Sequence, residues 1–430
     1  MAVQGPSSRR RATRGKNSDK KRDSVAIAVF GAGAPHAGLM AGALAYMYRH
    51  SKKTFDVFFT SGGGALIGLL FVAPKGKRPD EALREVAEFG VDDRIYRVFP
   101  VGYKTFFKNS PFTDLFREWA QFYKRDVVPR PFPGERPPAG YDPRQQRRRR
   151  LYNDWVDFWF SVLTPPTISS TSPGVCSHLP FLEAMVDFDR VNSSLSPSGF
   201  DFRDPVMVSL RPPVAVYLNY GWFYVNAYNL DTKSIQQFSN AMATDARRSG
   251  RPDPLEPPQG FAGPLTAAAI RAALSFPFVY PPQKVNGALY CEGAEVEPLN
   301  LPNVVGVVRR RDATLPTGQG ALPKVRVFLF DILGALEKEI MFSPRDLWEA
   351  YGLSIVTPVV SLAKMSETIY RKTPGLPELI RVPFEIPKQR RDRPLDWSYA
   401  NTTALWDAGW EAGKKFLEDH GDKLPERDDS

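Results

Sequence analysis

Two short apolar segments, each leading into a glycine-rich turn, limit what this chain can fold into. Residues 25–30 lead into the turn 31–38, and residues 55–59 lead into the sequence Thr-Ser-Gly-Gly-Gly at 60–64. A stretch of small and apolar residues without formal charge follows each turn. Short apolar runs bounded by glycine are typical of buried strands, so this order predicts strand, turn and helix twice in succession. Alternating strands and helices predict an α/β layered domain with a largely parallel sheet.

The same two regions, residues 25–48 and 57–74, are long enough without charge to suggest membrane spans. Their many glycines and Pro35 argue against a continuous helix, so we interpret both as strand–turn–helix units. The arginines at residues 9–11 before the first apolar run imitate a secretory signal. Cleavage after that run would remove the first glycine turn. We therefore predict a disordered basic tail at residues 1–24 and a cytoplasmic location.

Composition places the chain among ordinary globular proteins. Its 430 residues are 43% hydrophobic and 24% charged, which excludes a mostly disordered or fibrous protein. The formal net charge is +10, and the eight basic and two acidic side chains of the tail supply +6 of it. Two cysteines, Cys176 and Cys291, and four histidines are too few for a disulfide framework or a Cys-rich zinc site. We therefore expect a reducing compartment and no structural metal site.

A proline- and arginine-rich segment interrupts the alternation of strands and helices. Residues 124–150 hold six prolines and end in four consecutive arginines, which a regular core element cannot accommodate. We predict a surface insert or lid there, within one domain at residues 25–330. Residues 331–430 are predicted to form a helical extension packed on the same domain, with helices at 344–353 and 402–417.

The segment after these prolines has the composition of a membrane-surface helix. Residues 147–163 begin with the four arginines, and a helix predicted at 151–163 carries Trp155, Phe158 and Trp159 on one stripe. Cations suit lipid headgroups, and indole rings suit the boundary between water and hydrocarbon. The alternative is that the same stripe packs on the sheet. Nucleic-acid binding is not expected, because no aromatic–basic module surrounds the arginines.

Ser61 is the candidate nucleophile. It lies between a strand and a helix predicted at residues 65–72, and a sharp strand-to-helix turn lifts a hydroxyl above the sheet edge. Thr60 and Gly63 complete this turn, and the small residues Gly62 and Gly63 leave room for a substrate carbonyl. The alternative is that Ser61 only caps the helix, a role that serine fills well.

The first glycine turn is a candidate anion-binding loop. Gly31, Ala32, Gly33 and Ala34 offer backbone N–H groups to a nucleotide pyrophosphate or to the oxyanion of an acyl-transfer intermediate. A dinucleotide fingerprint requires its third glycine earlier than the next one in this chain, and no phosphate-loop lysine follows. His36, in the same turn, either packs or pairs with the candidate serine.

Glu292 is the candidate base. It ends a short predicted strand and precedes Gly293 and Ala294. A carboxylate placed in this way can accept a proton from a serine directly, without histidine. Glu295 and Glu297 are competing candidates, and the alternative for all three is a loop carboxylate paired with an arginine.

Together these elements resemble the patatin-like phospholipase family. The resemblance is carried by the first glycine turn, the Thr-Ser-Gly-Gly turn and the later acid-Gly-Ala turn, and it spans residues 25–305. Three intermediate segments, at residues 182–191, 229–233 and 272–282, are similar to family segments in the same order. The resemblance implies a three-layer αβα fold with a largely parallel central sheet.

The resemblance also implies a lipid acyl hydrolase, a phospholipase A or esterase. Ser61 would attack the acyl carbonyl and form an acyl-enzyme, and Glu292 would take its proton. The N–H groups of the first turn, Gly33 above all, and of Gly62 would stabilise the oxyanion. Water would then release the fatty acid, so the partner would be an acyl lipid or another ester. By this resemblance, no metal or organic cofactor would be needed.

Three positions depart from the family pattern. Glu292 stands where the family has aspartate, and Phe59 stands where its elbow begins with glycine. Pro35 and His36 stand where the glycine turn continues with arginine and glycine. These departures leave open a second function, in which a patatin-like protein binds acyl lipids with weak or no turnover.

Overall fold

The computed structural model describes residues 24–33, 36–108, 110–164, 174–179, 181–193, 196–199, 205–208, 214–217, 221–240, 260–314, 324–337, 347–388 and 396–427, together with residues 166 and 172. The predicted basic tail, apart from Ser24, therefore lies outside the described residues. Ala34 and Pro35 of the first glycine turn lie outside them as well.

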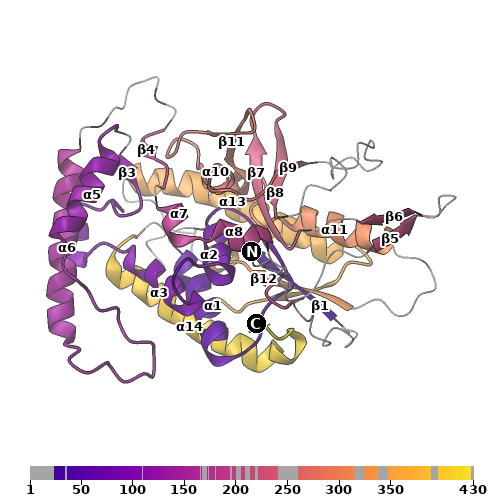
Figure 1. The fold of residues 1–430 in the computed structure, drawn as a ribbon, viewed down its shortest axis with the longest axis horizontal. Coiled ribbons are helices and arrows are strands. Elements are labelled where there is room, and N and C mark those ends of the chain that lie inside the picture. Colours follow the sequence, from indigo (N-terminus) through magenta and orange to yellow (C-terminus); the bar gives the residue numbers. More distant parts are fainter. Residues whose placement is uncertain are drawn as a thin grey trace, which may run out of the picture.

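One mixed sheet forms the centre of the fold (Figure 1). Its order in the described part of the chain is β10-β11-β7-β2-β1-β12-β13, and β8 and β9 extend it beyond the other edge of β7. The five strands from β7 to β13 in this order are parallel to one another. β11 runs antiparallel to both β7 and β10, and β8 runs antiparallel to β7 and parallel to β9. The bounds are β1 Ser24–Phe30, β2 Val57–Thr60, β7 Phe223–Asn229, β8 Ser234–Ser239, β9 Phe261–Gly263, β10 Gln283–Val285, β11 Ala288–Glu292, β12 Lys324–Phe330 and β13 Glu378–Arg381.

Helices flank this sheet, which confirms the predicted α/β fold with a largely parallel central sheet. The helices α1 (Ala37–His50), α3 (Pro79–Glu88) and α14 (Tyr399–His420) pack together, and α11 (Leu301–Thr314) packs with α13 (Leu347–Lys372). The other helices are α2 Gly63–Val72, α4 Asp93–Val98, α5 Thr113–Tyr123, α6 Pro143–Leu163, α7 Leu182–Met185, α8 Phe188–Ser193, α10 Ala267–Ala273, α12 Leu333–Glu337, and the 3-10 turns η1 Gly293–Glu295 and η3 Gly421–Lys423. Two small two-stranded sheets pair β3 (Phe107–Lys108) with β4 (Cys176–Ser177), and β5 (Pro205–Val208) with β6 (Val214–Tyr217).

The two uncharged regions fold as strand–turn–helix units. β1 and α1 account for the first, and β2 and α2 for the second, with almost every residue of both strands buried. Glycine and proline divide each region, so neither forms one long helix. Within the described ranges, no helix has both the length and the apolar character that a membrane span requires.

The C-terminal region belongs to the same core as the rest of the chain. β13 adds a parallel strand beside β12, so the region predicted as a helical extension also contributes to the sheet. The side chains of Trp406 and Phe416 on α14 are fully buried, and Phe416 packs against Phe328 and Phe330 of β12. The last hundred residues therefore complete the fold.

The proline-rich insert packs against α1, α3 and α14. Arg130 pairs with Asp407 of α14, and the ring of Phe132 stacks on Trp410. The helix that follows begins at Pro143, eight residues before the predicted start at residue 151. Proline suits the first turn of a helix, and the Asp142 side chain accepts a hydrogen bond from the Arg144 N–H there.

α1 and α14 cross at very short range, because both present glycine at the crossing. A Cβ atom on Gly409 would lie 2.0 Å from the backbone oxygen of Leu39, and one on Gly42 would lie 2.0 Å from the backbone oxygen of Trp406. Neither neighbour is a flexible side chain, so the helices would have to separate to accommodate a methyl group.

Gly409→Ala should therefore destabilise the protein by about 2–3 kcal/mol, although alanine favours an isolated helix over glycine by about 1 kcal/mol. Gly421→Ala is the matched control, because its nearest neighbour would lie 3.7 Å away. Urea unfolding of the two variants measures the difference. Equal midpoints for both would contradict the close crossing.

Candidate active site

The sheet brings the candidate nucleophile and the candidate acid to one edge of β7. β2 runs parallel to β7 and ends at Thr60, opposite Val225. β11 runs antiparallel to β7 and ends at Glu292, opposite Ala227. Because β8 pairs along the other edge of β7, β2 and β11 must meet end to end on this one. Two turns far apart in the chain thus emerge at the same point.

The apex of the strand-to-helix turn is Gly62. It is the last residue before α2, and its backbone has φ 48° and ψ −130°, a conformation that side chains of L-residues rarely adopt. Ser61 precedes this apex and is not among the non-glycine residues with positive φ. In a nucleophile elbow the strained apex residue carries the reacting hydroxyl. Here that position has no side chain.

Ser61 lies underneath the apex. Its side chain has no exposed area, and its Oγ donates a hydrogen bond to the backbone oxygen of Glu297 at 3.1 Å. The Nδ2 atom of Asn226 donates to the same oxygen at 2.7 Å. Among the described residues, no hydrogen bond joins Ser61 to Glu292. The Ser61 hydroxyl is therefore bound to the backbone of residue 297 and not to Glu292.

Glu292 fills the space above Gly62. A Cβ atom on Gly62 would lie 2.1 Å from Oε1 of Glu292 and 3.1 Å from the Cβ of Ala32. The carboxyl group thus occupies the volume into which an apex side chain would project. The nucleophile predicted from the sequence is Ser61, and that role stays a prediction, whereas the backbone conformation of Gly62 was not expected. The helix begins at Gly63, two residues before its predicted start at residue 65, so Gly62 is the last residue of the turn.

Burial controls the protonation of this acid. Burial, with a smaller contribution from Glu295, raises the pKa of Glu292 to about 8. The N-terminus of α2 favours a negative charge nearby, but desolvation outweighs it. At pH 7 the group is therefore mostly a neutral carboxylic acid, which donates one hydrogen bond and is a poor base.

The two competing acids have other surroundings. Burial raises the pKa of both Glu295 and Glu297. The side chain of Glu297 accepts a hydrogen bond from the Ser366 hydroxyl on α13 at 3.0 Å, so it faces that helix. Glu292 is the one whose carboxyl group touches the apex.

The predicted oxyanion loop has fewer available donors than expected. The N–H of Gly31 donates to Phe330 O at 3.3 Å, and that of Ala32 donates to Pro298 O at 3.2 Å, so neither points at the site. Both N–H groups thus already have acceptors in this structure, and their role as oxyanion donors stays a prediction. In the described part of the chain, no hydrogen bond uses the N–H of Gly33 or Gly62, while Ala34 lies outside it.

The remaining residues of the two turns are structural. Thr60 is buried, and its hydroxyl donates to Tyr224 O at 2.9 Å. His36 is almost fully buried, and burial lowers its pKa to about 4, so the imidazole is neutral. The hydroxyl of Ser61 is bonded to Glu297 and not to this histidine.

No group of three or more histidine, cysteine, aspartate or glutamate side chains within the described ranges could hold a metal ion. Cys176 and Cys291 are buried free thiols, and burial raises their pKa to about 12 and about 11. Neither is a thiolate at neutral pH.

Comparison with known proteins identifies the fold around this site. The profile of a family described as patatin-like phospholipase matches residues 28–304, which include Gly62 and Glu292. The chain belongs to the patatin-like phospholipase family. Membership supports lipid acyl hydrolysis in general, because that is the activity for which the family is named. Among solved structures, VipD from Legionella pneumophila is similar at 11% identity and a TM-score of 0.28, over 90% of this chain and 67% of that one. No curated protein matches the chain.

Stability of this patatin-like protein should fall with rising pH because of Glu292. Its pKa is about 8 in the folded chain, against the ordinary 4.5 of a glutamate, so the folded state holds a proton that the unfolded state releases between these values. Glu292→Gln removes that proton and should gain at least about 1 kcal/mol relative to wild type between pH 5 and pH 8.

Thermal unfolding over this pH range tests the expectation. Glu411→Gln, at an exposed position of α14, controls for the loss of one carboxylate. Parallel pH profiles for wild type and Glu292→Gln would show that the acid is not buried as described.

Proposed function

We propose that this patatin-like chain binds the acyl ester of a lipid at the Gly62 turn without forming an acyl-enzyme. One observation carries the proposal: the apex of the turn is a glycine, and the carboxyl group of Glu292 stands where an apex side chain would be. A serine at this apex could attack an acyl carbonyl placed above it, whereas glycine has no group with which to do so.

The hydrogen-bond donors at the turn suit an ester oxygen. The N–H groups of Gly33 and Gly62 are unused by the described residues, and the neutral Glu292 acid supplies an O–H. A carbonyl oxygen has two lone pairs, so any two of these three groups would satisfy it. The N-terminus of α2 adds its favourable potential for negative charge.

The second candidate is hydrolysis by the Ser61–Glu292 dyad, and the family match favours it. The Ser61 hydroxyl would leave the Glu297 carbonyl, its oxygen would bond to the acyl carbon, and its proton would pass to Glu292. Glu292 would return that proton to the leaving oxygen as the tetrahedral intermediate collapses and the alcohol departs. It would then take a proton from water, whose oxygen bonds to the acyl carbon, and would return that proton to Ser61 as the fatty acid leaves. The mechanism requires an ionised Glu292, so its rate should rise with pH towards about 8.

Labelling with a fluorophosphonate distinguishes the two candidates. Wild type should not be labelled, and Ser61→Ala should change nothing. The double variant Gly62→Ser with Glu292→Asp should gain labelling and ester turnover, because aspartate is one methylene shorter and vacates the volume for the new side chain. The cost of serine at this positive φ is about 1–3 kcal/mol.

The result that would overturn the proposal is labelling of wild type that Ser61→Ala abolishes, which would establish the dyad. A folded double variant that stays unlabelled would contradict the assignment of Gly62 as apex. Binding is read with a fluorescent phospholipid in micelles, which wild type should bind and leave chemically intact. If wild type did not bind this phospholipid, the proposed recognition of acyl lipids would be wrong.

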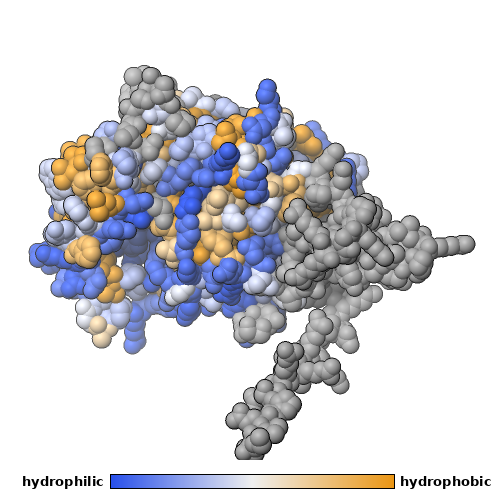
Figure 2. All heavy atoms as spheres, turned by 45° about the horizontal axis from the view of Figure 1, so that its top comes forward, coloured by the Kyte–Doolittle hydropathy of each residue, from blue (hydrophilic) through white to orange (hydrophobic). Residues whose placement is uncertain are grey.

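We also propose that the outer faces of α5 and α6 rest on an anionic membrane surface and that the protein is cytoplasmic. Figure 2 shows hydrophobic residues gathered at the left of the molecule, where α5 and α6 lie. The exposed apolar side chains on these helices are Phe112, Leu115, Trp119, Phe122, Tyr123, Tyr152, Trp155, Trp159, Val162 and Leu163, where Phe112 is the residue before α5.

Charge supports an anionic lipid partner for this surface. Arg147 and Arg148 on α6 are exposed, whereas Arg150 pairs with Glu88 and stacks on Tyr399. Only part of the arginine run is thus available to headgroups. Exposed indoles beside free cations are typical of interfacial helices.

The double variant Trp155→Ser with Trp159→Ser should lower binding to phosphatidylserine vesicles about tenfold, because two exposed indoles no longer leave water. Ile369→Ser on α13 is the control, since that side chain is as exposed but lies on another helix. Co-sedimentation measures the binding. Equal losses in both variants would mean that α5 and α6 have no special part in it.

A further inference from the structure

A pocket of about 680 Å³ lies between α5, α6 and the end of α3, and we call it the α5–α6 pocket. Its volume falls in the range of about 300–1,000 Å³ that small-molecule sites occupy. None of its lining residues belongs to the Gly62 turn or to β11. The pocket is therefore separate from the Gly62 turn.

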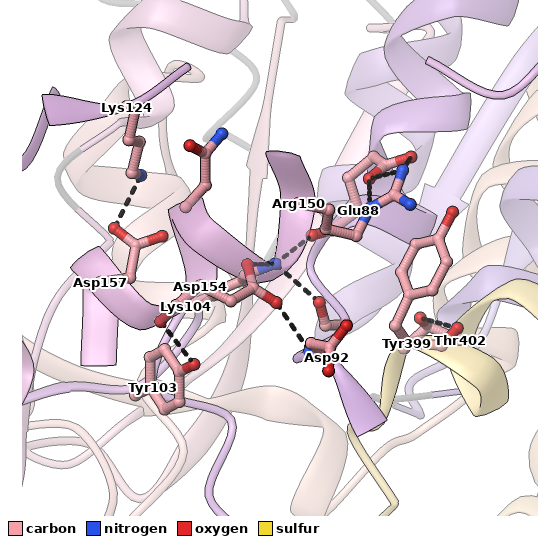
Figure 3. A network of polar contacts seen from close by, with 12 residues as sticks. Glu88, Asp92, Tyr103, Lys104, Lys124, Arg150, Asp154, Asp157, Tyr399 and Thr402 are labelled. Atoms are coloured by element: carbon pink, nitrogen blue, oxygen red, sulfur yellow. Dashed lines mark hydrogen bonds and ion pairs between the residues drawn. The ribbon is translucent and has the colours of Figure 1, made fainter. Parts of the chain in front are cut away.

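Ion pairs fix the walls of this pocket (Figure 3). Arg150 of α6 holds Glu88 of α3 through two hydrogen bonds of 3.0 Å. Lys104 pairs with Asp154 of α6 at 2.6 Å.

A third pair, between Lys124 and Asp157 at 2.7 Å, ties the end of α5 to α6. With all three pairs in place, the pocket is held open by its own walls and does not depend on a ligand to form.

The charges that line the pocket do not cancel. Each of its four acids has a basic partner: Glu88, Asp154 and Asp157 in the pairs above, and Glu85 with Lys77 outside the pocket. Two lining cations remain. Arg117 has only Asp114, at 3.6 Å and mostly exposed, and the described residues give Lys108 no acidic partner.

Arg117 also has an unsatisfied donor. Its Nη1 atom is buried and has no hydrogen-bond acceptor among the described residues. A buried guanidinium nitrogen without an acceptor is costly. Thr113, one turn earlier on α5, donates to the backbone oxygen of Lys108 at 2.6 Å, which holds both cations at the same end of the helix.

The uncharged part of the lining includes a group of aromatic rings. Five phenyl rings face the pocket: Phe89, Phe107, Phe116, Phe160 and Phe181. They come from four separate parts of the chain, and Phe181 packs against both Phe89 and Phe107. Aromatic walls beside two unneutralised cations form a site with one apolar part and one anion-binding part.

We propose that the α5–α6 pocket binds a single-chain amphiphile with an anionic head. The head, a carboxylate or a phosphate, takes the free donors of Arg117 and Lys108, and the hydrocarbon chain lies among the phenyl rings. The outer faces of the same two helices carry the exposed aromatic residues, so a molecule leaving a membrane would meet this pocket first.

Displacement of a dansylated fatty acid, followed by fluorescence, tests the proposal on the full chain. Oleate should displace the probe and oleyl alcohol should not, because the alcohol has no charge for the two cations. An oleoyl lysophosphatidate arm distinguishes a phosphate head from a carboxylate head. Arg117→Gln and Lys108→Gln should each weaken binding about tenfold.

Three further variants keep the result decisive. Ala120→Trp fills the pocket, since Ala120 lines it and is buried, and should abolish binding. Arg148→Gln removes an exposed cation of α6 outside the pocket and should leave binding within twofold of wild type. Glu292→Gln should also leave it unchanged, because that acid lies at the other site.

Two results would overturn the proposal. One is equal displacement of the probe by oleate and oleyl alcohol, which would show that the pocket does not recognise an anionic head. The other is a loss of binding in Glu292→Gln but not in Arg117→Gln, which would place the probe at the Gly62 turn. If Ala120→Trp fails to fold, as judged by circular dichroism, the two cation variants decide.

Discussion

The shared edge of β7 is the constraint on which the candidate active site depends. β2 arrives parallel and β11 antiparallel, and they stop opposite Val225 and Ala227. Only Asn226 separates their ends, and its side chain holds the Glu297 carbonyl that also receives the Ser61 hydroxyl. A slip of one residue in either pairing would turn its last side chain to the opposite face of the sheet. The position of Glu292 over Gly62 is thus set by backbone pairing.

Two opposing effects, burial and the nearby positive potential, determine whether Glu292 is protonated. The N-terminus of α2 and the unused N–H groups favour an anion. Burial acts in the opposite direction and raises the pKa of Glu292 to about 8. Glu292 and Gly62 are complementary in volume, because the carboxyl group occupies the space that a side chain at residue 62 would fill. The family fold is retained around this site.

Much of the fold could be predicted from local sequence because glycine divides the two uncharged regions so clearly. β1, α1, β2 and α2 were all expected near their observed positions. The apex was not, since the predicted start of the helix at residue 65 lay two positions after the true one, and only the backbone dihedrals distinguish Ser61 from Gly62. The N–H groups of Gly31 and Ala32 were assigned to an oxyanion because their acceptors in this structure, Phe330 and Pro298, come from distant segments. The sequence of the turn carries no information about contacts of this kind.

The place of β12 in the sheet has a consequence for biosynthesis. The family match ends at residue 304, but β1 is paired along one whole edge by β12, residues 324–330. A nascent chain therefore carries β1 through most of translation with half its backbone groups unpaired. Exposed strand edges recruit other strands, so emerging polypeptide is vulnerable to misassociation until its last quarter leaves the ribosome. We expect such a chain to depend on chaperones during synthesis more than its stable finished core suggests.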